Sequence, residues 1–141
     1  MFELNRQELS AYLLAGKSTF TVKNPTTGNH VTYKVSVAKD VDNLYFVRGR
    51  AGQGGRYIYL GYFNYPNHNL QASKKSEVNN PQWSHLAGAF QWILKKAYGF
   101  ELPESLEVYH EGACGRCGMK LTTPKSLLVG FGPVCKRLMA R

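Results

Sequence analysis

Val31-Thr32-Tyr33-Lys34-Val35-Ser36-Val37 decides the fold class, because apolar and polar side chains alternate along it without a break. A period of two predicts a β-strand with one buried face and one exposed face. The preceding stretch Thr19-Phe20-Thr21-Val22-Lys23 alternates in the same way. Residues 24–29, which join the two, are rich in Asn, Pro and Gly and have the composition of a turn. The sequence therefore predicts an antiparallel hairpin with a longer loop.

The rest of the N-terminal region extends this hairpin into a domain. Residues 44–47 and 56–63 are rich in aromatic and apolar side chains and are expected to complete a four-strand meander. A short helix is expected over residues 5–15, with Asn5 as its N-cap. A second helix is expected after Asn80-Pro81, because apolar residues recur there at helical spacing. We therefore expect an α+β domain over residues 1–105, a small antiparallel meander sheet covered by a helix.

The C-terminal segment contains the pattern H-x3-C-x2-C-x17-C, formed by His110, Cys114, Cys117 and Cys135. A C-x2-C turn aims two thiolates at one point, and a structural zinc site needs four ligands in a tetrahedron. Cys135 follows Gly132-Pro133, which predicts that it lies in the first turn of a helix. We therefore expect a treble-clef-like zinc finger over residues 106–141, in which these four side chains bind Zn2+.

Two alternatives to this metal site stay open. Glu111 can take the place of His110 as the fourth ligand, although imidazole accompanies thiolates more often at structural zinc. The other histidines reach the site only if the two regions pack closely. Alternatively, Cys114 and Cys117 form a redox pair, but such pairs usually accompany a βαβ pattern that this sequence lacks.

The formal net charge is +9, from 18 Lys and Arg against 9 Asp and Glu. Such a surplus favours polyanionic partners, above all nucleic acid, although it also keeps a small protein soluble. The Gly-rich basic segment 49–56 can wrap phosphates or serve only as a mobile hairpin loop. The tyrosines near it can stack unpaired bases or belong to the core. The residues expected to bind nucleic acid or a protein partner are Arg48, Arg50, Arg56, Tyr57, Tyr59, Arg116, Lys120, Lys136 and Arg137.

Other patterns argue against a membrane protein and against an enzyme. The sequence has no apolar run of 18 residues and no evident signal peptide, so we expect no membrane span and a place in the bacterial cytoplasm. The odd number of cysteines fits a reducing compartment. Gly16-Lys17-Ser18 lacks the earlier glycine of a phosphate-binding loop. No paired carboxylates or nucleophile–histidine pairing stands out, and we expect no catalytic activity.

The C-terminal pattern C-G-R-C-G, followed by G-x-G-P-x-C, resembles a recurrent bacteriophage and bacterial domain of unknown function. The residues that carry the resemblance are 110–126 and 130–135, and the strands at 18–37 and 57–63 also resemble phage proteins with this ending. The resemblance implies a small zinc-binding protein of phage or mobile-element origin, and it implies no particular activity.

Two functions are compatible with these observations. The first is a non-catalytic, zinc-stabilised basic protein that binds DNA or RNA. The alternative is a phage-encoded interaction factor that binds and inhibits a host protein machine, such as a defence nuclease or a CRISPR effector. Salt dependence separates the two, because phosphate contacts weaken steeply with salt and a protein interface does so less.

Overall fold

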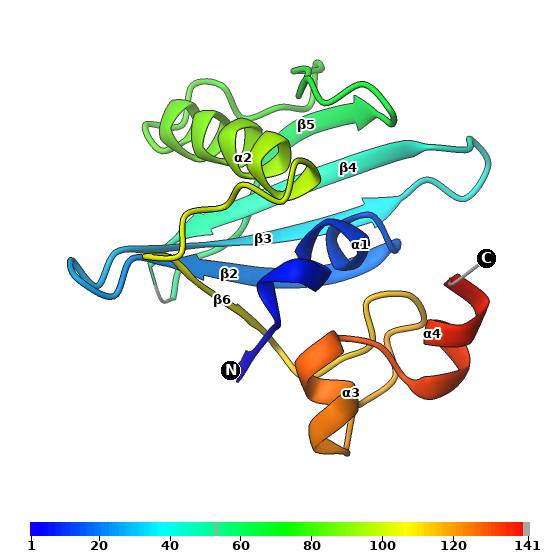
Figure 1. Cartoon of the computed structure of the whole chain (residues 1–141). Helices are drawn as coiled ribbons and strands as arrows, with labels where there is room; N and C mark the ends of the chain where they lie inside the picture. Colours follow the sequence, from blue (N-terminus) through cyan, green and yellow to red (C-terminus); the bar gives the residue numbers. More distant parts are fainter. Residues whose placement is uncertain (53, 140–141) are drawn as a thin grey trace.

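The computed structural model describes residues 1–52 and 54–139, so Gln53 of the Gly-rich segment and the last two residues of the expected finger lie outside the described part. The fold is α+β and is built on one six-stranded antiparallel sheet with the strand order β1-β6-β2-β3-β4-β5 (Figure 1). The strands are β1 (Phe2–Glu3), β2 (Lys17–Lys23), β3 (His30–Val37), β4 (Leu44–Ala51), β5 (Ile58–Asn64) and β6 (Glu107–His110). The helices are η1 (Arg6–Glu8), α1 (Leu9–Leu13), α2 (Trp83–Tyr98), α3 (Pro124–Val129) and α4 (Pro133–Met139).

The predicted hairpin forms the centre of the sheet. The whole of β2 pairs with β3, with Phe20 opposite Tyr33 and Val22 opposite Val31. β4 and β5 follow in meander order, as expected from the alternating stretches. Because directly opposed residues of antiparallel strands share a face, this register brings Phe20, Tyr33, Val35 and Val47 together on one side.

The sheet is larger than the predicted four strands because β6 and β1 extend it beyond β2. β6 pairs with β2, placing His110 opposite Phe20, and β1 pairs with β6. Residues 107–110, which the sequence analysis assigns to the finger, thus belong to the sheet. The physical reason is that β2 would otherwise expose an edge of unpaired N–H and C=O groups, and β6 satisfies them.

Helices α1 and α2 cover the apolar side of the sheet (Figure 1). Phe90 of α2 packs against Tyr33 and Phe63, with ring centroids 5.1 and 5.9 Å away. The Tyr33 hydroxyl donates to the Leu86 carbonyl at 2.8 Å, which satisfies the one polar group of this buried ring. The core therefore lies between the sheet and these two helices.

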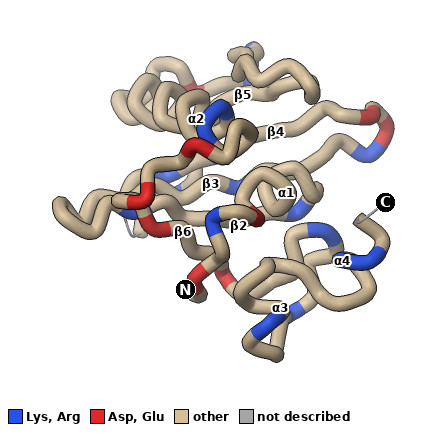
Figure 2. Tube along the Cα trace, in the orientation of Figure 1, with Lys and Arg blue, Asp and Glu red and all other residues tan. Residues whose placement is uncertain are grey.

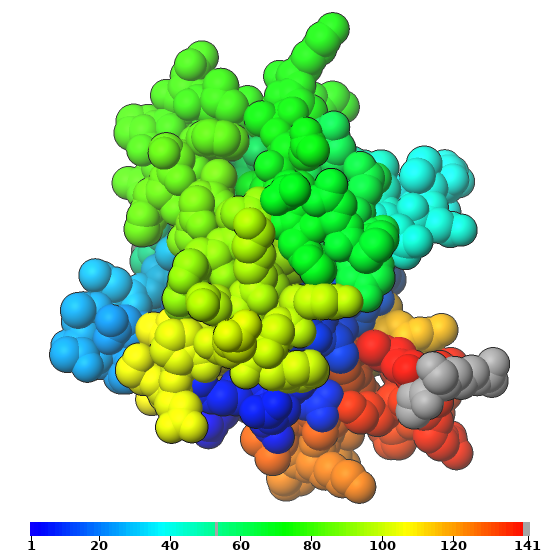
Figure 3. All heavy atoms as spheres, turned by 45° about the horizontal axis from the view of Figure 1, so that its top comes forward, coloured from blue at the N-terminus to red at the C-terminus, as the bar shows by residue number. Residues whose placement is uncertain are grey.

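The C-terminal segment packs beside the N-terminal residues rather than standing apart (Figure 3, orange and red beneath blue). The Asn5 N–H donates to Leu128 at 2.8 Å, and the Lys17 N–H donates to Gly115 at 2.8 Å. The Tyr12 hydroxyl donates to the Ala113 carbonyl at 3.1 Å. These bonds fix the cysteine-containing segment against η1, α1 and the start of β2.

Candidate metal centre and basic face

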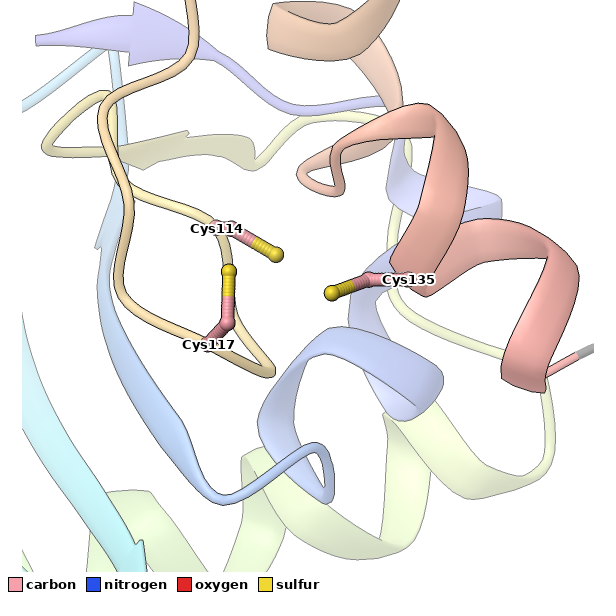
Figure 4. A group of neighbouring side chains, drawn as sticks. All are labelled: Cys114, Cys117 and Cys135. Atoms are coloured by element: carbon pink, nitrogen blue, oxygen red, sulfur yellow. The ribbon is translucent and has the colours of Figure 1, made fainter.

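Three cysteines converge beside α1 and point toward one another (Figure 4). Cys114 and Cys117 flank a tight turn, and Cys135 lies in the first turn of α4, which begins at Pro133 as predicted. Their Sγ atoms all lie within 4.8 Å of one another. Cys114 and Cys135 are buried, and Cys117 is the most accessible of the three. Such a trio can hold a metal ion.

Glycines shape the turn that carries two of these thiols. The N–H of Gly118, whose φ is +81°, donates to the Cys114 carbonyl at 2.9 Å and closes the turn. A Cβ atom at Gly115 would lie 2.7 Å from the Tyr12 ring, so only glycine permits this approach. The spacing of the C-G-R-C-G sequence is therefore explained by backbone geometry and by packing against α1.

The surroundings of Cys114 favour its thiolate form. Burial by itself would raise the pKa of this thiol, but the backbone N–H groups of Cys117, Gly132 and Arg116 together outweigh it and lower the pKa to about 7. The Arg116 guanidinium donates to the Cys135 sulfur at 3.6 Å. The Arg116 guanidinium by itself lowers the pKa of Cys135, but burial and the neighbouring thiols outweigh it and raise that pKa. Of these two thiols, Cys114 is therefore the one favoured as a thiolate, the form that binds metals.

The structure does not bring His110 into this cluster. His110 lies in β6 with 0% of its surface exposed. Its Nδ1 accepts from the Gly112 N–H at 2.9 Å, so Nε2 carries the proton and donates to the Leu127 carbonyl at 2.6 Å. Burial lowers the pKa of the imidazole, which keeps it neutral. Both nitrogens therefore hold the backbone together, which corrects the assignment of His110 as fourth ligand.

Glu111 does not join the cysteines either. Among the described residues the group of potential Cys, His, Asp and Glu ligands contains only the three cysteines. The remaining positions of the chain are Gln53, Ala140 and Arg141, whose side chains are none of these types. The protein thus offers three side-chain ligands of these types where the sequence predicted four. The sequence does contain a signal that His110 belongs to a strand, because Val108 and His110 alternate with Glu107 and Tyr109.

A second group of predicted site residues gathers on the face of the sheet opposite α1 and α2. Cross-strand pairing aligns Thr19, Lys34, Arg48 and Tyr59 in one row. The Arg48 guanidinium carbon lies 5.5 Å from the Tyr59 ring centroid. The next row aligns Thr21, Thr32 and Arg50.

Tyr57 stands between two of these cations. Its ring centroid lies 4.4 Å from the Lys34 ammonium and 4.7 Å from the Arg50 guanidinium carbon. In the described part of the chain, neither cation has a carboxylate within salt-bridge distance, and the same holds for Arg48. We call Lys34, Arg48, Arg50, Tyr57 and Tyr59 the basic face. Lys34 was not among the predicted site residues, although its polar place in the alternating stretch puts it on this side.

Arg56 does not contribute a free cation to the basic face. Its Nη1 donates to Glu77 at 3.1 Å, and the same carboxylate accepts from the Tyr59 N–H at 2.8 Å. The hydrogen bonds from the Arg56 guanidinium and the Tyr59 backbone lower the pKa of Glu77 to about 2. Arg56 therefore fastens the segment between β5 and α2 to the edge of the sheet, a role that sequence spacing cannot reveal.

The finger carries a separate basic surface. Figure 2 shows Lys and Arg, without acidic residues, from the cysteine turn through α4. Two of the predicted residues are engaged, since Lys136 pairs with Glu8 at 2.8 Å and Arg116 contacts Cys135. Lys120 and Arg137 are exposed. The predicted binding residues thus fall into two groups on different parts of the molecule.

Comparison with known proteins identifies a family that matches the C-terminal segment. Residues 104–140 match the model of a family of unknown function, DUF6011. The match spans β6, the cysteine turn, α3 and α4, and it includes all three cysteines. No curated protein and no solved structure matches the chain. None of the helices in the described part is long and apolar enough to cross a membrane.

Proposed function

We propose that this protein is a non-catalytic, zinc-stabilised nucleic-acid-binding protein that engages its ligand through the basic face. The observation that carries the proposal is the placement of Lys34, Arg48 and Arg50 beside Tyr57 and Tyr59 on the side of the sheet away from α1 and α2. Cations without carboxylate partners attract phosphates, and tyrosine rings on a sheet face stack unpaired bases. Single-stranded DNA or RNA is therefore the proposed ligand.

The tyrosines make this face more than a charged surface. Each guanidinium that lies over a tyrosine ring is held in one place by cation–π attraction, which lowers the entropy lost when it meets a phosphate. A base that stacks on Tyr57 would take the place of the Lys34 ammonium, which would then be free to meet a phosphate. Phosphates and bases alternate along a single strand, so its phosphates can meet the cations while its bases stack on the tyrosine rings.

The proposed metal is Zn2+, because thiolates on a C-x2-C turn and at a helix start are typical of structural zinc. The three cysteines would bind the ion and would tie the cysteine turn to α4. The segment from Gly112 to Met139 buries few large apolar side chains, chiefly Leu121 and Phe131, so metal binding would supply folding energy. This is the role of a treble-clef-like finger.

A second candidate function is inhibition of a host protein machine by binding to it. The observation that favours it is an apolar groove of about 490 Å³ beside α2, lined by Trp92, Ile93, Leu106 and His85. Trp92 is 42% exposed, and tryptophan is a common anchor at protein interfaces. A partner bound here would leave the basic face free.

The test compares two double variants that each remove two positive charges. Arg48→Ala with Arg50→Ala removes cations of the basic face, and Lys74→Ala with Lys75→Ala removes exposed cations elsewhere. We expect the arginine variant to weaken binding to a labelled single strand and to reduce the slope of log K against log salt by about 1.4. The lysine variant should bind nearly as the unchanged protein does. Equal effects of the two variants would mean that only net charge matters.

A further inference from the structure

A polar pocket of about 300 Å³ opens beside the basic face. Its polar side chains come from Thr21, His30, Thr32, Arg50 and Glu111. The backbone of the loop between β4 and β5 lines it as well, at Gly52 and Gly54. We call this cavity the Arg50 pocket. It is distinct from the metal centre, and it shares His30 and Gly52 with the groove beside α2.

Unused donors are present in this pocket. The Arg50 Nε is buried and has no hydrogen-bond partner in the described part of the chain. The Thr21 and Thr32 hydroxyls are bonded to each other at 2.8 Å and are both buried. Since one hydroxyl donates to the other, the pair keeps one O–H proton for a further acceptor. Buried donors without partners are costly unless a ligand satisfies them.

The pocket adjoins a platform for a base. Arg50 lines the pocket, and its guanidinium lies over the Tyr57 ring, with 4.7 Å between the guanidinium carbon and the ring centroid. A phosphate bound to Arg50 would therefore lie close to the Tyr57 ring. In a nucleotide, the phosphate and the base are likewise close to each other.

We propose that the Arg50 pocket binds a phosphate group of a nucleotide whose base stacks on Tyr57 in place of the Lys34 ammonium. The phosphate accepts from the Arg50 guanidinium and from the free hydroxyl proton of the Thr21–Thr32 pair. The same chemistry can come from a phosphate within a nucleic-acid strand or from a free nucleoside monophosphate. This proposal deepens the proposed function by assigning one phosphate to a defined pocket, and it rests on that function for the strand.

Glu111 sets the position of the phosphate within the pocket. Its carboxylate repels an anion, so the phosphate binds at the Arg50 side of the cavity, away from residue 111. Removal of this negative charge should strengthen phosphate binding. Glu111 is exposed, so a substitution there leaves the core unchanged.

The experiment uses the full chain and two probes, adenosine 5′-monophosphate and a labelled single-stranded oligonucleotide without a terminal phosphate. The test variant, Thr21→Val with Thr32→Val, removes both hydroxyls while keeping shape and β-branching, and leaves neither threonine unpaired. Thr19→Val, on the same strand and face but outside the pocket, is the matched control. Amide NMR shifts locate the monophosphate, and anisotropy measures the affinity for the oligonucleotide.

We expect the monophosphate to shift the amides of residues 21, 32 and 50. The double valine variant should lose about tenfold in affinity for both probes without a change in salt slope, because no charge is removed. Thr19→Val should bind as the unchanged protein does. Monophosphate binding without oligonucleotide binding would keep the pocket and overturn the proposed function.

Unchanged affinity of the double valine variant for both probes would overturn the proposal that the Arg50 pocket binds a phosphate, even if the oligonucleotide still bound to the basic face. Should the double variant fail to fold, Glu111→Gln provides the test. It should bind either probe about threefold more tightly, as expected for the loss of one nearby repulsion. Unchanged or weaker binding by Glu111→Gln would contradict the assignment.

Discussion

The sheet and the cysteine finger are stabilised by different means. The sheet buries large apolar side chains from β2, β3, β4 and β5, including Phe20 and Tyr33, together with Phe90 and other apolar side chains of α2. The finger has two short helices and few buried apolar residues of its own, and it relies on three convergent thiols and on bonds to the N-terminal segment. One sequence thus combines a region that folds by apolar burial with a region whose folding we propose to depend on a metal ion.

The largest expected effect that tests this comparison is the loss of metal. Cys117→Ser removes the most accessible ligand and should abolish binding of one Zn2+ per chain, because two remaining thiolates hold the ion far more weakly. Hydrogen exchange should then rise across residues 112–139 while β3 and β4 stay protected. Metal content by mass spectrometry and exchange measured on the same sample check both statements. Unchanged exchange in the finger would show that it folds without the ion.

A substitution in the core should lower the stability of the sheet and leave the metal bound. Phe90→Ala removes a fully buried ring that contacts Tyr33 and Phe63, and should lower the free energy of unfolding by about 3–5 kcal/mol. Denaturant unfolding followed by fluorescence measures this loss. At denaturant concentrations where the protein is still native, one Zn2+ per chain should remain bound. Loss of the metal under native conditions would mean that the two regions fold as one unit.

His110 lies at the junction of the two regions, and its substitution separates a structural role from a ligand role. His110→Gln should lower the free energy of unfolding by about 1–3 kcal/mol, since a buried polar bond to Gly112 or Leu127 is lost. The metal content should stay at one ion per chain, because the ring does not face the cysteines. Metal analysis after dialysis decides the matter, and a stoichiometry near zero would restore His110 as a ligand.

The smallest expected effect concerns Glu77 and the segment that it fastens. Its pKa of about 2 lies below the ordinary 4.5, so its contribution to stability is present above pH 4.5 and is lost as the pH falls from 4.5 through about 2. Glu77→Gln should remove this dependence and raise hydrogen exchange at residues 73–78 only. Thermal unfolding at a series of pH values measures the pH dependence of stability. Identical profiles of the unchanged protein and of Glu77→Gln would contradict the role assigned to Glu77.

The sequence alone determined the elements whose signals are local. Alternation predicted β2 and β3, helical spacing predicted α2, and Pro133 placed Cys135 at a helix start, because each pattern reflects the geometry of a single element. The convergence of three cysteines also followed, since a C-x2-C turn and one later thiol seldom serve anything but a metal.

Only the tertiary structure decided the roles of His110, Arg56 and Lys34, because these roles depend on partners that are distant in the sequence. The spacing of His110 to Cys114 suggested a ligand, but pairing of β6 with β2 carries that imidazole into the interior, where backbone groups take both nitrogens. Glu77 likewise takes Arg56 out of the set of free cations, whereas register places Lys34 within it. Spacing along a chain fixes which residues can meet locally, and only the pairing of strands fixes which face and which neighbour each side chain receives.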